Sequence, residues 1–155
     1  AIGGRADIID QVNNGVVHAG TYNGNPVALA AAQATLGYLA RERPYEVISA
    51  RAARLAEGAT SALVAQGIRG HAHSVGPIVQ VALGTDRVEA FDQYLNADWA
   101  LYNRLIVALL RRGQFVLPGG RWYLSTAHTD ADVDQSLDAF VDAAKEISHE
   151  AREGR

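Results

Sequence analysis

A tight turn that opens directly into a helix is the strongest structural signal in this sequence. Residues 20–26 read Gly-Thr-Tyr-Asn-Gly-Asn-Pro, and an alanine-rich run follows them. Glycine allows backbone conformations that side chains forbid. Asn25 is a favoured helix N-cap, and Pro26 suits the first helical position because its missing N–H has no partner there. We therefore predict a turn that leads into a helix from Pro26 to about Ala40.

The same turn contains groups that bind anions. Thr21 supplies a hydroxyl, and backbone N–H groups and the helix N-terminus lie beside it in sequence. Because ordinary helices also begin with a glycine and a cap, the spacing alone leaves two interpretations open, an anion site and a plain turn. The helix itself is apolar nearly all round, which predicts that it is buried against neighbouring backbone.

Length and composition restrict the class of protein. The chain has 155 residues, 48% of them hydrophobic, a formal net charge of −3 and no cysteine, so it is long enough for one domain with a sizeable core. The charge argues against a nucleic-acid or membrane-surface binder. No apolar run approaches the about 20 residues of a membrane span, and the lack of cysteine is compatible with a cytoplasmic location.

The remaining sequence alternates helices and short strands. Apolar spacing of three and four residues predicts helices from Pro44 to a cap at Gly67, over 88–95, over 97–112, and from Thr129 onward. Thr129 and the acidic residue three positions later form a variant of the capping box. Alternation and turn residues predict strands at 69–74, 78–83, 115–117 and 122–124, and a short one at 16–17. The expected fold is α+β, a few-stranded and mainly antiparallel sheet packed by helices.

Three separated motifs give a more specific indication. They are Gly3-Gly4-Arg5, the run 20–26, and Ser125-Thr126-Ala127-His128-Thr129. Together, and in this order, they resemble the C-terminal part of class III pyridoxal-phosphate-dependent aminotransferases, in the branch of glutamate-1-semialdehyde aminomutase. The resemblance implies the C-terminal small domain of a fold-type I enzyme. Residues 1–24 would be the tail of the large cofactor-binding domain, 25–43 an interdomain helix, and 44–155 the small domain.

The resemblance also implies roles for particular residues. Gly20 and Thr21 would bind the phosphate of pyridoxal 5′-phosphate, reaching the site of the neighbouring subunit in a homodimer. Arg121, which follows a Pro-Gly-Gly turn and shares a strand face with Tyr123, would bind a substrate carboxylate through two parallel hydrogen bonds. A surface arginine on an edge strand is the alternative. Aminomutases usually carry a glutamate where this chain has Gly120, which favours an aminotransferase acting on an amino acid, including a β-amino acid, and a 2-keto acid.

One required group is missing from the sequence. Pyridoxal-phosphate chemistry needs a lysine that forms a Schiff base, and in the resembled family this lysine precedes the Gly-Gly-Arg motif. The single lysine here, Lys145, lies near the C-terminus. We therefore assign no catalytic residue and expect the 155-residue chain to be inactive alone. Because it has no methionine and begins Ala-Ile-Gly-Gly, we also expect it to be part of a longer protein.

Other candidate sites are weaker. His71 and His73 have the spacing of two metal ligands on one strand face, but no acidic or cysteine partner is close in sequence, so we predict no metal site. His128 is expected to fix the turn before the last helix. Three functions remain open: an aminotransferase part, an aminomutase part, or a non-catalytic assembly module that self-associates through exposed apolar surface.

Overall fold

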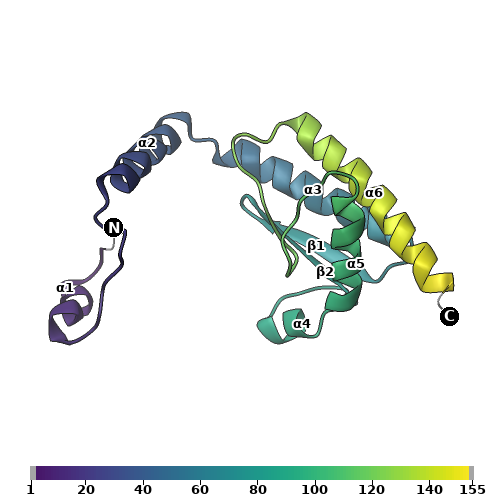
Figure 1. The fold of residues 1–155 in the computed structure, drawn as a ribbon, viewed down its shortest axis with the longest axis horizontal. Coiled ribbons are helices and arrows are strands. Elements are labelled where there is room, and N and C mark those ends of the chain that lie inside the picture. Colours follow the sequence, from purple (N-terminus) through teal and green to yellow (C-terminus); the bar gives the residue numbers. More distant parts are fainter. Residues whose placement is uncertain (1–2, 154–155) are drawn as a thin grey trace. The chain divides into compact units, whose positions relative to one another are not determined.

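The computed structural model describes residues 3–153, with side chains up to His149. The chain forms two compact units, and the division falls between Arg43 and Pro44. Both units appear in Figure 1, and each is described by itself. No helix among the described residues is both long enough and apolar enough to cross a membrane.

The first unit consists of short helices and irregular segments. It contains α1 (Ala6–Ile9), the 3-10 helix η1 (Asp10–Asn14) and α2 (Pro26–Glu42). The predicted strand at 16–17 is wrong, because these residues are irregular and lie between a turn and the segment that leads to Gly20. Among residues 3–153 no strand pairs with them, and a lone pair of valines does not form a strand without a partner.

Helix α2 forms where the sequence predicts it, but its predicted burial is wrong. The Asn25 side chain accepts hydrogen bonds from the N–H groups of Val27 and Ala28, at 2.9 and 3.2 Å, so the cap is the one expected. None of its residues is buried, and Leu36 is 66% exposed. An apolar pattern predicts that a helix needs a covering surface, and the described part of this unit does not supply one.

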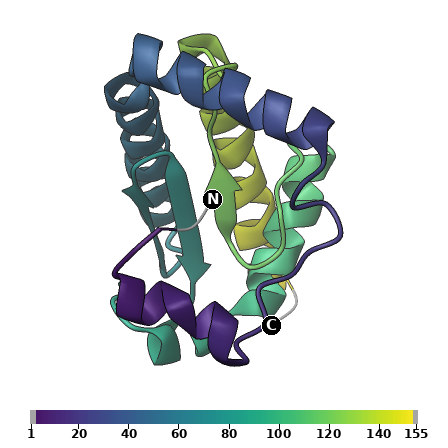
Figure 2. The same cartoon turned by 90° about the vertical axis from the view of Figure 1, so that its left-hand side faces the viewer.

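The second unit is an antiparallel sheet with helices on one face. In chain order its elements are α3 (Tyr45–Ala65), β1 (Gly70–Val75), β2 (Ile78–Leu83), α4 (Phe91–Leu95), α5 (Trp99–Leu110), β3 (Arg121–Tyr123) and α6 (Asp130–Glu153). The three strands lie in the order β1-β2-β3. In Figure 2, α3 and α6 lie behind this sheet. The predicted α+β class with a small antiparallel sheet is therefore confirmed.

The alternation of residues in each strand separates a covered face from an open face. Val79, Val81 and Leu83 of β2 are fully buried against the helices, together with Trp122 of β3. The alternate residues project from the opposite face, where Ala82 of β2 is also buried but Tyr123 of β3 is 52% exposed. Because Arg121 and Tyr123 flank the buried Trp122, both belong to the open face.

Residues 115–117 do not form the predicted strand. They are irregular, and β3 pairs only with β2 among the described elements. The turn at Pro118-Gly119-Gly120 is present, but both glycines have positive φ angles, 81° and 76°. The turn joins β3 to β2 through a hydrogen bond from the Val81 N–H to the Gly120 carbonyl, at 2.7 Å. The preceding segment is thereby separated from β3 instead of pairing with it.

Candidate functional site

The turn before α2 is held by its own backbone. The Asn23 N–H donates to the Gly20 carbonyl and the Asn25 N–H to the Tyr22 carbonyl, both at 3.1 Å. A Cβ at position 20 would lie 2.5 Å from the Asn23 side-chain oxygen, so a residue with a side chain there would displace Asn23. The only close contact at position 20 is therefore with the Asn23 side chain, which is exposed and can change its rotamer.

Hydrogen-bond donors remain available in this turn. The Thr21 hydroxyl and its backbone N–H are exposed and make no hydrogen bond within residues 3–153. The first N–H groups of α2, in contrast, already donate to the Asn25 cap. The helix N-terminus suggested by the sequence therefore contributes less than Thr21 to the anion-binding capacity of the turn.

Arg121 occupies an open position on the sheet. It begins β3, lies directly opposite Gln80 of β2 in the register, and is exposed. Most described arginines pair with a carboxylate, as Arg51 does with Asp130, but no carboxylate in the described part of the chain pairs with Arg121. An unpaired guanidinium on a strand retains all its donors for an external anion.

The turn that precedes Arg121 is anchored from two other elements. The Gly119 carbonyl accepts a hydrogen bond from the Gln80 side-chain amide at 3.0 Å and another from the Tyr94 hydroxyl at 3.2 Å. Gln80 also donates to the Val81 carbonyl, at 3.2 Å. The backbone before Arg121 is thereby fixed to β2 and α4.

Gly120 cannot be replaced without moving this backbone. A Cβ built at position 120 overlaps the Val81 carbonyl oxygen, and the residue has a φ of 76°. The overlap involves a strand backbone, which cannot yield as the end of a flexible side chain can. The turn therefore excludes every side chain at this position, including the glutamate expected of an aminomutase.

A pocket of about 280 Å³ lies along the edge of β3. The segment 114–117, β3 and the start of α6 enclose it, and its lining combines apolar side chains with the polar residues Arg121, His128 and Asp132. Apolar walls with a few polar groups are typical of sites that bind small molecules. Within the second unit, the pocket brings Arg121 together with the histidine of the Ser125–Thr129 motif.

The Ser125–Thr129 motif forms the turn that the sequence predicts. The Ser125 N–H donates to Nδ1 of His128 at 3.0 Å, so Nδ1 is an acceptor and a neutral ring carries its proton on Nε2. Thr129 caps α6 and binds Asp132 through its N–H and hydroxyl, both at 2.7 Å. These two bonds, the backbone one first, lower the pKa of the Asp132 carboxyl. The predicted structural role of His128 agrees with this geometry.

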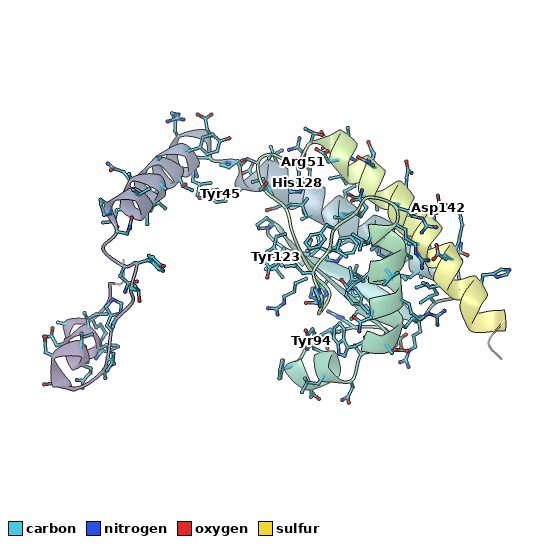
Figure 3. The ribbon with its side chains drawn as sticks, in the orientation of Figure 1. Tyr45, Arg51, Tyr94, Tyr123, His128 and Asp142 are labelled. Atoms are coloured by element: carbon cyan, nitrogen blue, oxygen red, sulfur yellow. The ribbon has the colours of Figure 1, made fainter. Side chains whose placement is uncertain are left out.

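Arg51 ties this motif to α3. Its guanidinium donates to the Asp130 carboxylate, with Nε at 2.9 Å, and to the His128 carbonyl, also at 2.9 Å. The hydrogen bond with Arg51 lowers the pKa of the Asp130 carboxyl. Figure 3 shows Arg51 and His128 next to each other where α3 meets the loop before α6. Sequence reasoning missed this contact because the two segments are far apart along the chain.

The remaining candidates do not form a site. The His71 and His73 rings share one face of β1 and stack with centroids 5.9 Å apart, and burial, followed by the charge of His71, lowers the pKa of His73. No cluster of three metal-ligating side chains occurs among the described residues. Lys145 is exposed on α6 and pairs with Asp142 at 2.9 Å.

The structure places the predicted site residues in different units. Gly20 and Thr21 belong to the first unit, and Arg121 belongs to the second. Within the second unit, Arg121 and His128 line one pocket. The fixed turn at 118–120 and its contacts with Gln80 and Tyr94 were not predicted from sequence, because no local pattern links these residues.

Comparison with known sequences identifies relatives over nearly the whole chain. No family model matches it. The glutamate-1-semialdehyde 2,1-aminomutase of Methanopyrus kandleri is 34% identical over 152 residues, which are 96% of this chain and 35% of that protein. The enzyme of the same name from Desulforudis audaxviator is 37% identical over 147 residues, 92% of this chain and 34% of the relative. The chain thus spans about a third of the length of the curated relatives that it matches.

Solved structures with this fold carry the names of transaminases. A β-phenylalanine aminotransferase from Variovorax paradoxus matches with a TM-score of 0.75 and 25% identity, over 90% of this chain and 33% of its own. A structure described as a transaminase with PLP bound matches with a TM-score of 0.79 at 20% identity, over 96% of this chain and 35% of that chain, a likeness of fold alone. These relatives confirm the resemblance to an aminomutase-like class III aminotransferase and to its C-terminal portion.

Proposed function

We propose that this chain is the C-terminal part of a pyridoxal-phosphate-dependent aminotransferase that moves an amino group between an amino acid and a 2-keto acid. The premise is its similarity to glutamate-1-semialdehyde aminomutases and to a β-phenylalanine aminotransferase. The observation that carries the proposal is Arg121, whose exposed guanidinium follows an anchored turn and has no carboxylate partner among the described residues.

The turn at residues 20–25 fits the phosphate of the cofactor. A phosphate group accepts hydrogen bonds, and the Thr21 hydroxyl and N–H are exposed donors beside Gly20, where no side chain hinders the approach of an anion. Gly20 and Thr21 would therefore hold the phosphate. Pyridoxal phosphate supplies the electron sink that amino-group transfer requires.

Arg121 would bind the substrate carboxylate. A guanidinium forms two parallel hydrogen bonds with a carboxylate, which fixes the orientation of the amino acid as well as its position. The turn before Arg121 is already fixed by hydrogen bonds. Its backbone therefore loses little conformational entropy when the substrate binds, which favours binding. The name of the Variovorax relative supports a β-amino acid as one substrate class.

Gly120 favours an aminotransferase over an aminomutase. In the resembled aminomutases a glutamate usually occupies this position, and the backbone of the present turn has no room for any side chain there. The curated relatives at 34% and 37% identity are nevertheless named aminomutases. An aminomutase is therefore the second candidate.

The proposal includes the organisation of the complete enzyme. Residues 1–24 would belong to the large cofactor-binding domain, residues 25–43 would form the interdomain helix, and residues 44–155 the small domain. The enzyme would be a cytoplasmic homodimer with a shared active site. The exposed apolar residues of α2 support this organisation, because an apolar helix without a covering surface is expected to meet one elsewhere.

We also infer that the 155 residues are inactive by themselves. The single lysine of the sequence, Lys145, is paired with Asp142 on α6 and lies outside the pocket that contains Arg121. A group that forms a Schiff base must reach the cofactor. Lys145 is exposed on α6 and does not line the pocket of Arg121, so the covalent step needs a lysine from outside these residues.

The proposal is tested with the protein expressed together with the sequence that its gene encodes upstream of Ala1. We expect transfer of the amino group from an amino acid to 2-oxoglutarate, measured as glutamate formed, and no conversion of glutamate-1-semialdehyde. Conversion of glutamate-1-semialdehyde instead would establish the aminomutase. A folded protein with neither activity and no visible cofactor absorbance would contradict both and favour an assembly module.

A further inference from the structure

One buried phenol hydroxyl connects the two sides of the 118–120 turn that precedes Arg121. Tyr102, on α5, has 0% exposure. Its hydroxyl donates to the Leu117 carbonyl at 3.2 Å and accepts a hydrogen bond from the indole N–H of Trp122 at 2.8 Å. Leu117 precedes the Pro-Gly-Gly turn and Trp122 follows it, so this single oxygen bridges the turn.

The phenol is itself held firmly in place. Its ring contacts Trp99 edge-on, with centroids 5.8 Å apart, and belongs to the core cluster that also contains Phe140 of α6. Phe140 in turn packs against the Trp122 ring, with centroids 5.7 Å apart. Burial raises the pKa of Tyr102 to about 12, so its hydroxyl remains a neutral donor and acceptor over the working range of an enzyme.

Fixing Trp122 also fixes Arg121. The two residues are neighbours in β3 and project to opposite faces, so a rotation of the strand that moves the indole must also move the guanidinium. The Gly119 carbonyl has two further anchors, Gln80 and Tyr94, but these hold the turn and not the strand. Among the described residues, Tyr102 is the side chain that links the strand directly to a helix by a hydrogen bond.

We propose that Tyr102 is a positioning residue for substrate recognition, which holds Arg121 in the geometry that selects substrates carrying a carboxylate. The proposal rests on the proposed function of Arg121 and deepens it. Tyr102 does not touch the substrate. Its hydroxyl strengthens the binding of substrates that carry a carboxylate. It does not affect the binding of substrates that lack one.

The test is Tyr102→Phe in the complete enzyme, assayed with an amino acid and with the amine of the same carbon skeleton that lacks the carboxylate. We expect KM for the amino acid to rise about tenfold, with kcat and the kinetics of the amine nearly unchanged, because only carboxylate binding uses Arg121. Tyr45→Phe is the matched control, since the exposed Tyr45 hydroxyl makes no hydrogen bond in the described chain. An equal rise of KM for the amino acid and for the amine in Tyr102→Phe would overturn the proposal.

A double variant separates this proposal from the function on which it rests. If Arg121→Lys removes the preference for the amino acid, adding Tyr102→Phe should leave the remaining preference unchanged, because the two residues act through one contact. Additive effects would overturn the positioning role of Tyr102. An Arg121→Lys enzyme that keeps the full preference would instead overturn the proposed role of Arg121.

Hydrogen exchange gives a readout that is independent of activity. In the 155-residue chain, Tyr102→Phe should increase amide exchange in peptides that cover residues 117–124 while leaving α6 protected. Tyr45→Phe should change neither region. Unchanged exchange at 117–124 would contradict the stabilisation of this segment by the Tyr102 hydroxyl. Loss of protection throughout residues 44–153 would show that Tyr102 supports the whole core instead of the turn before Arg121.

Discussion

The two units of this chain are stabilised in different ways. Residues 44–153 contain every buried side chain that the structure describes, and their sheet and helices share one core. Residues 3–43 contain none, and their helices depend on local hydrogen bonds such as the Asn25 cap. Most of the stability of helices in proteins comes from packing of an apolar face, and none of the 17 residues of α2 is buried. The second unit therefore contains the packing that stabilises its fold. The first unit exposes apolar side chains that its own described residues do not cover.

The residues of the proposed site are divided between the same two units. Thr21, the proposed phosphate ligand, lies in the unit without a core, and Arg121, the proposed substrate ligand, lies on a sheet that is fixed by one. Substrate recognition should therefore be sensitive to packing inside the second unit. Cofactor binding should depend on local turn geometry in the first. The following predictions test this separation, beginning with the largest expected effect.

Phe140→Ala should destabilise the second unit strongly. Its ring is fully buried and packs on Trp122, so truncation leaves a cavity in the core and should lower the free energy of unfolding by about 3–5 kcal/mol. Urea denaturation followed by tryptophan fluorescence measures the loss, because both tryptophans lie in this unit. Leu36→Ala in α2 is the control, and a loss as large there would show that the first unit is packed after all.

Gly120→Ala should lower the free energy of unfolding of the second unit by at least about 2 kcal/mol. The added Cβ would stand at a positive φ and overlap the Val81 carbonyl oxygen. Gly113→Ala separates the two causes. Gly113 also has a positive φ, 77°, but a Cβ there meets nothing within 4 Å. Urea denaturation should give a clearly smaller loss for Gly113→Ala, and equal losses would mean that the overlap at position 120 relaxes freely.

Asn25→Ala should weaken α2 alone. The substitution removes the acceptor for the Val27 and Ala28 N–H groups, which lowers helix stability by about 1 kcal/mol. Hydrogen exchange should become faster in α2 while the urea midpoint of the second unit stays constant. Asn25→Ser, which retains a capping oxygen, should preserve most of the protection. A shifted midpoint would contradict the expectation that the Asn25 cap stabilises α2 alone.

Acid should weaken the contact between α3 and α6 slightly. The pKa of Asp130 is lowered in the folded chain by Arg51, so its contribution to stability is present above the pKa of the unfolded chain and is lost as pH falls through the folded value. The difference in unfolding free energy between the native chain and Asp130→Asn should therefore shrink below about pH 4. Asp138→Asn is the control, because Asp138 is exposed on α6 and forms no ion pair with the described residues. A difference that stays constant down to low pH would contradict the lowered pKa.

The sequence predicted most elements of the fold, and its errors have physical causes. Helix caps and apolar spacing identified the helices, since these signals are local, as the Thr129–Asp132 cap illustrates. The strand predicted at 115–117 is absent because the two glycines of the following turn direct β3 toward β2. The burial predicted for α2 is wrong within the described chain because an apolar run indicates the need for a covering surface and not its presence.

The candidate site was predictable only in part. Thr21 and Arg121 were identified from motifs, and their roles stay predictions. The contacts that fix Arg121 were not predictable, because Tyr102 of α5 reaches Trp122, and Gln80 comes to lie opposite Arg121, only in the folded unit. Likewise, the exclusion of a side chain at Gly120 depends on the position of the Val81 carbonyl in the neighbouring strand.

The most direct test of the account is a titration of the complete enzyme with pyridoxal phosphate, followed by its visible absorbance, for the native sequence, Thr21→Ala and Arg121→Ala. Removing one hydrogen bond to a charged phosphate should raise the cofactor dissociation constant of Thr21→Ala by about ten- to a hundredfold. Arg121→Ala should leave that constant nearly unchanged and raise KM for the amino acid instead. Equal cofactor affinity of Thr21→Ala and the native sequence would contradict the assignment of the phosphate to the first unit, and an unchanged KM in Arg121→Ala would contradict the assignment of the substrate to the second.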